Sequence, residues 1–189
     1  MGRWEPDAQG RLASAAMELY GERGYDNTTV EEIAARAGLT ERTFFRYFAD
    51  KREVLFGGSQ VLQEFLVTRV REAPESLAPL DVIATAYMAA ADDIFEARRE
   101  FSRARQAIIV ANVELQEREL IKLATLNAAL AGALRQRGVA DPAASLAAEA
   151  GGSAFKLGFE RWVADTAGKS FSTFIGEALD ALRAVAAGG

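Results

Sequence analysis

The residues best suited to chemistry lie in one short segment, TERTFFRYF, which runs from Thr40 to Phe48. Arg42, Phe45 and Arg46 are spaced i, i+3 and i+4, so on a helix they share one face. Guanidinium groups can donate hydrogen bonds to guanine O6 and N7 or to phosphates, and a phenyl ring can contact thymine methyl groups. The spacing therefore predicts a helix whose outer face suits the major groove of DNA.

The other face of this helix is apolar. Phe44 and Phe48 are four residues apart, and together with Leu39 they can pack on Ile33 of the preceding segment. Both rings are therefore expected to be buried.

Alternatives remain for the outer residues. Phe45 could also belong to the core, and Tyr47 can pack partly while its hydroxyl reaches a phosphate. Arg42 and Arg46 could be ordinary solvated charges. Their position on this helix favours contact with DNA.

Helix start and stop signals position the segment. Thr29 followed by Glu32 is a capping-box pattern, and the helix after it stops at Gly38, a residue favoured just past a helix end. Thr40 is the expected cap of the next helix, with Glu41 in the first turn, where the helix dipole favours an anion. Two short helices joined by a glycine-containing turn predict a helix-turn-helix.

Composition excludes several kinds of site. The 189 residues contain no Cys and no His, which removes disulfides, thiolate metal sites and histidine or cysteine catalysis. The N-terminal segment shows no apolar signal region, and no segment offers roughly 18 uninterrupted apolar residues for a membrane span. We therefore expect a cytoplasmic protein with no membrane partner, no metal and no cofactor.

The net charge of −5 argues against a nucleic-acid partner. However, the segment from Leu39 to Arg52 holds four basic and two acidic residues. Groove binding depends on the local patch more than on the total charge, and two copies of the chain would double this patch. The charge pattern thus favours a dimer.

Helical periodicity continues through the rest of the chain and predicts an all-α fold. An apolar stripe from Leu12 to Tyr20 forms the first helix, and Asp50 is the expected cap of a long fourth helix. Further helices are expected at about 80–97, 100–111, 113–137, 143–166 and 171–187.

Residues 8–56 resemble the DNA-binding region of TetR-family transcriptional regulators. The matching features are the Thr28-Thr29 start, Ile33-Ala34, Ala37-Gly38, the Thr40 cap, the aromatic pair before Phe48, and Lys51. The resemblance implies a dimer of nine-helix subunits, with a DNA-binding domain at residues 1–56 and a ligand-binding and dimerisation domain at residues 57–189. One departure is Phe45, where many members carry Tyr, so only apolar contact or stacking remains there. The expected DNA-facing residues are Thr29, Thr40, Glu41, Arg42, Thr43, Phe45, Arg46, Tyr47 and Lys51.

Apolar side chains in the C-terminal part suggest a ligand pocket. The expected lining residues are Met88, Phe95, Phe101, Arg105, Ile109, Phe155, Phe159 and Trp162. Arginines in RREFSRAR lie beside them and would suit an acyl chain with an anionic head group. This part resembles the TetR subgroup that binds acyl-CoA-like ligands. A solid core and a solvated basic face are the alternatives.

Small and apolar residues at helical spacing suggest a dimer interface made by the last two helices. The expected interface residues are Ala147, Gly151, Ala154, Phe171, Phe174, Ala178 and Leu182. Packing within one chain is the alternative.

The sequence thus predicts a ligand-responsive homodimeric repressor that binds a palindromic operator in double-stranded DNA and responds to a small apolar or amphipathic effector. A helical metalloenzyme using carboxylates near Asp92 or Glu114 lacks the Glu-x-x-His pattern. A helical small-molecule-binding or adaptor protein without DNA binding is the other alternative, and it predicts no salt-dependent affinity for DNA.

Overall fold

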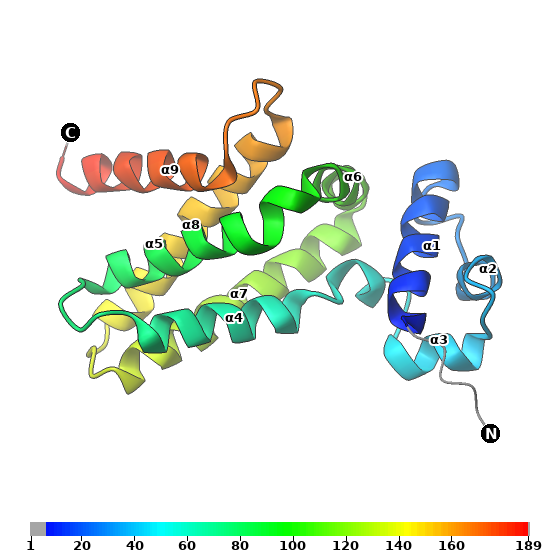
Figure 1. Cartoon of the computed structure of the whole chain (residues 1–189), viewed down its shortest axis with the longest axis horizontal. Coiled ribbons are helices and arrows are strands. Elements are labelled where there is room, and N and C mark those ends of the chain that lie inside the picture. Colours follow the sequence, from blue (N-terminus) through cyan, green and yellow to red (C-terminus); the bar gives the residue numbers. More distant parts are fainter. Residues whose placement is uncertain (1–6, 189) are drawn as a thin grey trace. The chain divides into compact units, whose positions relative to one another are not determined.

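A computed structural model describes residues 7–188, and within this range the chain forms helices and no strand, which confirms the predicted all-α class. Within the same residues, no helix combines the length and the apolarity that crossing a bilayer requires. The α-helices are α1 (Ala8–Arg23), α2 (Val30–Arg36), α3 (Glu41–Tyr47), α4 (Ser59–Glu72), α5 (Pro79–Ala90), α6 (Arg99–Val110), α7 (Val113–Gln136), α8 (Ala143–Ala164) and α9 (Phe171–Ala186) (Figure 1).

The chain divides into two compact units. The first unit contains the chain up to Gly58 together with Ala104–Glu119, and the second contains Ser59–Arg103 and the chain from Leu120 onward. The sequence prediction placed 104–119 in the C-terminal domain instead. Helices α6 and α7 each have one part in each unit, a division that no local sequence signal reveals.

In the first unit, α1 packs against α2 and α3 around an apolar core. Leu12 of α1, Ile33 of α2 and Phe44 of α3 are fully buried there. Ile109 of α6 and Leu115 of α7 belong to the same core. The inner face of α3, the helix that carries the candidate DNA contacts, is therefore held in an apolar core to which α1, α2, α6 and α7 also contribute.

The expectation that Asp50 caps a long fourth helix is wrong. Asp50 Oδ1 accepts hydrogen bonds from the backbone N–H groups of Arg52 (2.8 Å) and Glu53 (3.2 Å), and these start the short 3₁₀ helix η1 (Glu53–Phe56). The α4 helix begins only after the Gly57-Gly58 pair. Each glycine costs about 1 kcal/mol in a helix interior relative to Ala, so the helical run breaks here.

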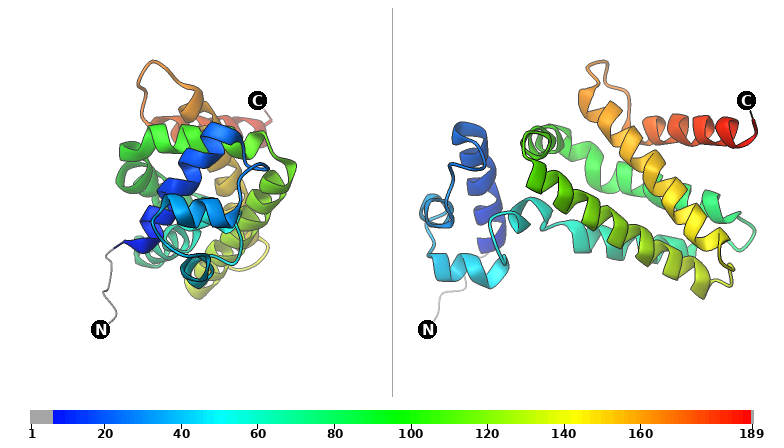
Figure 2. Two further views of the ribbon diagram at one scale, coloured as in Figure 1. Left: turned by 90° about the vertical axis from the view of Figure 1, so that its right-hand side faces the viewer. Right: turned by 180° about the vertical axis from the view of Figure 1, so that it is seen from behind.

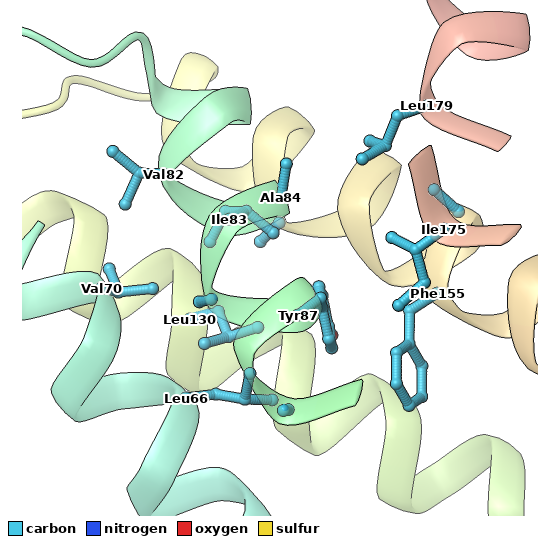
Figure 3. Close-up of a cluster of buried hydrophobic side chains, with 14 of the residues drawn as sticks. Leu66, Val70, Val82, Ile83, Ala84, Tyr87, Leu130, Phe155, Ile175 and Leu179 are labelled. Atoms are coloured by element: carbon cyan, nitrogen blue, oxygen red, sulfur yellow. The ribbon is translucent and has the colours of Figure 1, made fainter. Parts of the chain in front are cut away.

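In the second unit, α5 is the central helix and packs against α4, α8 and α9 (Figures 1 and 2). Figure 3 shows part of the core that these helices share, with Leu66 from α4, Tyr87 from α5, Leu130 from α7 and Phe155 from α8. Because all four helices contribute fully buried or nearly buried side chains, the unit has one continuous interior.

The predicted helix over 80–97 is shorter than expected. The α5 helix ends at Ala90, and the chain continues through the π-helical turn η2 (Ala91–Phe95) and the 3₁₀ turn η3 (Glu96–Arg98) before α6. In this irregular segment the Glu96 carboxylate accepts a hydrogen bond from the backbone N–H of Phe171 at 2.9 Å. Phe171 is the first residue of α9, so the segment stabilises the start of that helix.

Candidate nucleic-acid interface

Helices α2 and α3 form a helix-turn-helix whose two helix starts are capped. Thr29 Oγ1 accepts a hydrogen bond from the Glu32 N–H at 3.2 Å, and the Glu32 carboxylate accepts one from the Thr29 N–H at 3.0 Å. Thr40 Oγ1 accepts a hydrogen bond from the Thr43 N–H at 3.2 Å. The predicted capping box and the Thr40 cap are confirmed.

The turn between the two helices depends on Gly38. Its φ of 67° lies in the left-handed region that disfavours side chains. A Cβ at this position would also lie 2.9 Å from the Arg11 guanidinium, which donates a hydrogen bond to the Ala37 carbonyl. Backbone conformation and the close approach of α1 therefore both favour glycine here.

The two faces of α3 differ sharply in exposure. Phe44 and Phe48 are buried, with 0% and 4% of their surface exposed, as the spacing predicted. Phe45 is 54% exposed and Tyr47 is 38% exposed. Among the other candidate DNA-facing residues, Thr43 and Lys51 are half-buried, and those exposed are Thr29, Thr40, Glu41, Arg42 and Arg46.

The two arginines of α3 differ in their surroundings. Arg46 donates a hydrogen bond to the Tyr47 hydroxyl at 3.0 Å, and its guanidinium lies 4.8 Å from the centre of the Tyr47 ring. Arg42 makes no hydrogen bond or ion pair with any other residue in the range 7–188. Among the Lys and Arg residues of that range, only Arg98 shares this property. Arg42 is thus an exposed cation whose donors are available to a partner.

Lys51 is bound within the first unit. Its ammonium donates hydrogen bonds to the carbonyl oxygens of Tyr25 (2.9 Å) and Thr28 (3.0 Å) and lies 4.3 Å from the centre of the Tyr25 ring. The Tyr20 hydroxyl donates a hydrogen bond to the Lys51 carbonyl at 2.7 Å. Burial, with a smaller contribution from the Asp50 charge, raises the pKa of Tyr20, so this donor stays protonated. Lys51 therefore ties the segment after α3 to the loop before α2, a role that its sequence position does not reveal.

A buried arginine supports η1 from α6. Arg105 Nε donates a hydrogen bond to the Leu55 carbonyl at 2.7 Å, and Nη1 donates to the Glu119 carboxylate at 3.0 Å. Burial lowers the pKa of Arg105, and the negative charge of Glu119 opposes this effect. Arg118 of α7 forms an ion pair with Glu53 at 2.6 Å. Charged groups as well as apolar contacts therefore hold residues 104–119 to the rest of the first unit.

The residues predicted to line a pocket are divided between the units. Arg105 and Ile109 lie in the first unit, where Ile109 is part of the core, and Phe101 of the second unit is 48% exposed. Six aromatic residues form a cluster in the second unit, and the centres of neighbouring rings are 4.6 to 6.3 Å apart. Its members are Tyr87, Phe95, Phe155, Phe159, Trp162 and Phe171. Met88 is half-buried beside this core.

Most residues predicted for a dimer interface are buried within the single chain. A Cβ on Gly151 would lie 2.2 Å from Cγ2 of Ile83 on α5, and a Cβ on Gly152 would lie 2.3 Å from Oδ1 of Asn127 on α7. The small residues of α8 therefore allow close packing within the second unit, the alternative that the sequence left open. The buried residues of the predicted set are Ala147, Gly151, Ala154, Phe171, Phe174 and Ala178, whereas Leu182 is half-buried.

The open side of α8 carries other apolar residues. Leu146 is 65% exposed and Leu157 is 54% exposed, and their separation of 11 residues places them on one face. At about 100° per residue, this face lies roughly opposite the buried face of α8.

Two carboxylates near the candidate metal ligands Asp92 and Glu114 form ion pairs with arginines. Asp93 forms an ion pair with Arg69, and Glu119 forms one with Arg105. Within residues 7–188, no group of three or more His, Cys, Asp or Glu side chains is arranged to hold a metal ion.

Comparison with known proteins agrees with this geometry. Residues 12–56, which contain the helix-turn-helix, match the family model for bacterial regulatory proteins of the tetR family. The chain therefore carries the DNA-binding region of the TetR family. Its curated relatives include the HTH-type transcriptional regulator TcmR of Streptomyces glaucescens, which is 35% identical over 79 residues, covering 42% of this chain and 35% of TcmR. The HTH-type transcriptional repressor KstR2 of Mycobacterium tuberculosis is 31% identical over 87 residues, covering 46% of this chain and 44% of KstR2. These matches span less than half the length of either relative.

Solved TetR-family structures share the fold over nearly the whole chain. FadR of Thermus thermophilus, in complex with lauroyl-CoA, has a TM-score of 0.59 and 24% identity, with 93% of each chain covered. SmeT, the repressor of the Stenotrophomonas maltophilia multidrug efflux pump SmeDEF, has a TM-score of 0.60 and 19% identity, with 94% of this chain and 89% of SmeT covered. At these identities the likeness shows a common fold, with a helix-turn-helix and a larger helical part.

Proposed function

We propose that this protein is a TetR-family transcription regulator that reads DNA with α3. The observation that carries the proposal is the outer face of α3, where Arg42, Phe45 and Arg46 are exposed beside a fully anchored inner face. Arg42 suits a bidentate contact to guanine, and Phe45 suits the methyl group of thymine. Glu41, exposed on the first turn, suits the amino group of cytosine.

Contacts to phosphates would fix the orientation of α3. The hydroxyl groups of Thr29, Thr40, Thr43 and Tyr47 lie at helix starts or beside the reading face. Hydroxyl groups of this kind commonly bond phosphates and set the register of a protein on the duplex. Arg46, already held beside Tyr47, would act with it as one unit.

We further propose that the regulator is a homodimer that binds an approximately palindromic operator. A helix of seven residues offers few contacts, so two copies separated by about 34–36 Å along the duplex would be needed for tight binding. The exposed apolar residues Leu146 and Leu157 on α8, and Val185 on α9 (75% exposed), support a subunit contact there. The buried small residues of α8 would hold this helix close to α5 and α7, so that its exposed side is fixed in place for the partner subunit.

The proposed regulator is a repressor that responds to a small molecule bound in the second unit. The FadR structure contains lauroyl-CoA, and a related SmeT structure contains triclosan. These ligands support an apolar or amphipathic effector, an acyl-CoA-like molecule among them, bound near the aromatic cluster. A coupling free energy of about 1–3 kcal/mol between effector and DNA would suffice to relieve repression.

The deciding experiment begins with selection of bound sequences from random DNA. Arg42→Ala is then titrated against the selected operator in a mobility-shift assay, and we expect a loss of about 1–3 kcal/mol in binding free energy. Arg98→Ala is the matched control, because Arg98 is also exposed and has no partner among residues 7–188, but it lies in the second unit. Equal affinity of the wild type and Arg42→Ala would show that the reading face is misidentified.

A helical ligand-binding or adaptor protein without DNA binding is the competing function. The regulator predicts that operator affinity falls steeply as salt rises, because bound phosphates release counterions. The adaptor predicts no selected sequence and no such slope.

A further inference from the structure

Unpartnered polar atoms inside the second unit indicate what kind of molecule it binds. We propose that Trp162 and Arg99 form a site for the carboxylate of an otherwise apolar molecule, and that this molecule is the effector if the proposed function holds. The site itself is defined by residues of the second unit alone.

Trp162 supplies the first unpartnered donor. Its side chain is fully buried, stacks on Phe171 with ring centres 4.8 Å apart, and contacts Phe159 at 5.8 Å. Its indole N–H has no acceptor among the described residues. Buried indole N–H groups normally have a hydrogen-bond partner, so this one can donate to a ligand atom.

Arg99 supplies the second donor at the same place. Its guanidinium lies 5.2 Å from the centre of the Trp162 ring. Nη2 of Arg99 donates a hydrogen bond to the Lys169 carbonyl at 2.5 Å, but the buried Nε–H has no acceptor among the described residues. Because Trp162 and Arg99 both offer N–H groups, the group that fits must be an acceptor. A carboxylate has two oxygens, can accept from both residues, and is favoured by the guanidinium charge.

The neighbouring charges do not cancel this preference. Asp165 forms a long ion pair with Nη2 of Arg99 at 3.5 Å, and its carboxylate also accepts shorter hydrogen bonds from the backbone N–H groups of Gly168 (2.8 Å) and Lys169 (3.0 Å). Glu96 accepts its bond from the backbone of α9, and Glu100 pairs with Arg103 at 2.8 Å. Each nearby carboxylate thus has its own donors, while two donors of the site remain without acceptors.

The aromatic cluster determines the rest of the molecule. Phe95 and Phe159 are half-buried members that lie beside the fully buried Phe171 and Trp162. A ligand whose carboxylate binds Trp162 and Arg99 would place its body against these two rings. The site therefore suits a carboxylate with an alkyl or aryl body, and it disfavours an amine of the same shape.

The first test compares decanoate with decylamine, which have the same chain length and opposite charge. Isothermal titration of the full chain should show decanoate binding at least tenfold more tightly than decylamine. The sequence contains two tryptophans, at positions 4 and 162, so a Trp4→Phe protein reports from Trp162 alone. Decanoate should change its fluorescence. Equal binding of the two ligands, or no binding of decanoate, would overturn the proposal.

Two substitutions locate the carboxylate. Trp162→Phe keeps a ring but removes the N–H, and Arg99→Lys keeps the positive charge but removes the Nε–H. Each should weaken decanoate binding about tenfold, the size expected for one charge-assisted hydrogen bond. Arg98→Lys is the matched control and should leave it unchanged. An equal loss in Arg98→Lys would show a diffuse charge effect and contradict the site. If thermal melting shows that Trp162→Phe does not fold, the comparison of Arg99→Lys with Arg98→Lys still decides.

The last measurement separates this proposal from the regulatory function. Operator binding and decanoate binding are measured separately on the wild-type protein. Decanoate binding without any operator binding would leave the carboxylate site standing and remove the proposed function. Operator binding by a chain that shows no affinity for decanoate would do the reverse.

Discussion

The two units use aromatic side chains in opposite ways. On α3, Phe44 is buried in the core of the first unit, whereas the adjacent Phe45 is 54% exposed. In the aromatic cluster, Tyr87 and Trp162 are both fully buried, although each carries a polar atom that lacks a partner among the described residues. An exposed ring next to guanidiniums indicates a surface that meets another molecule. A polar atom that is buried among rings without a partner is the observation from which we propose a ligand site in the second unit.

The largest effect should separate the two phenylalanines of α3. Phe44→Ala removes a fully buried ring and should lower the free energy of unfolding by about 3–5 kcal/mol. Phe45→Ala should change it by less than about 0.5 kcal/mol, because the site is on the surface. Urea denaturation followed by circular dichroism measures both.

The same pair also tests the reading face. Phe45→Ala should weaken operator binding while stability is unchanged. A protein destabilised equally by both substitutions would show that Phe45 belongs to the core, the alternative left open by the sequence.

Lys51 tests whether a basic residue near α3 acts on the fold or on DNA. Lys51→Met removes hydrogen bonds to three carbonyls of the loop before α2 and should cost about 1.5–3 kcal/mol of stability. The dependence of operator affinity on salt should keep the wild-type slope, because a residue that binds only the fold neutralises no phosphate. A reduced slope in Lys51→Met, with unchanged stability, would instead identify Lys51 as a phosphate contact.

The glycines of the second unit give a smaller, paired effect. Gly152→Ala places a Cβ 2.3 Å from the Asn127 carbonyl oxygen and disturbs the hydrogen bond from Asn127 to Glu149 (2.8 Å). We expect a loss of about 1–2 kcal/mol in the free energy of unfolding, because overpacking outweighs the gain in helix propensity. Gly132→Ala is the control, since a Cβ there meets no atom within 4 Å, and it should stabilise α7. Equal stabilisation by both would contradict the close packing of α8 on α7.

Signals within a few residues of one another were sufficient to predict the helix-turn-helix. The Thr29 and Thr40 caps and the Gly38 turn involve neighbours three residues away or a single backbone angle. Asp50 shows the limit of such signals. A carboxylate that accepts from the next N–H groups starts a 3₁₀ turn as well as an α-helix, and the local pattern is the same for both.

Contacts between distant segments could not be predicted in this way. The Arg105 guanidinium donates a hydrogen bond to a carbonyl 50 residues earlier in the chain, a contact that no local sequence pattern indicates. The small residues of α8 present a related problem. Their spacing permits close approach of another helix, but only the positions of Ile83 and Asn127 show that the approaching helices belong to the same chain.

Asp50 gives the smallest and most specific prediction. Hydrogen bonds from the Arg52 guanidinium, at 2.6 Å for the closest pair of atoms, outweigh partial burial and hold the pKa of Asp50 below its usual range. A lowered pKa in the folded state contributes stability that is present above the unfolded value of about 3.9 and is lost as the pH falls through the folded value. Asp50→Asn keeps the oxygen that caps η1 but cannot ionise. The difference in melting temperature between wild type and Asp50→Asn should therefore stay constant from pH 7 to about pH 5 and shrink below about pH 4. Because every other carboxylate titrates equally in both proteins, a difference that stays constant down to pH 2 would show that the Arg52 pair contributes nothing to the stability of the segment after α3.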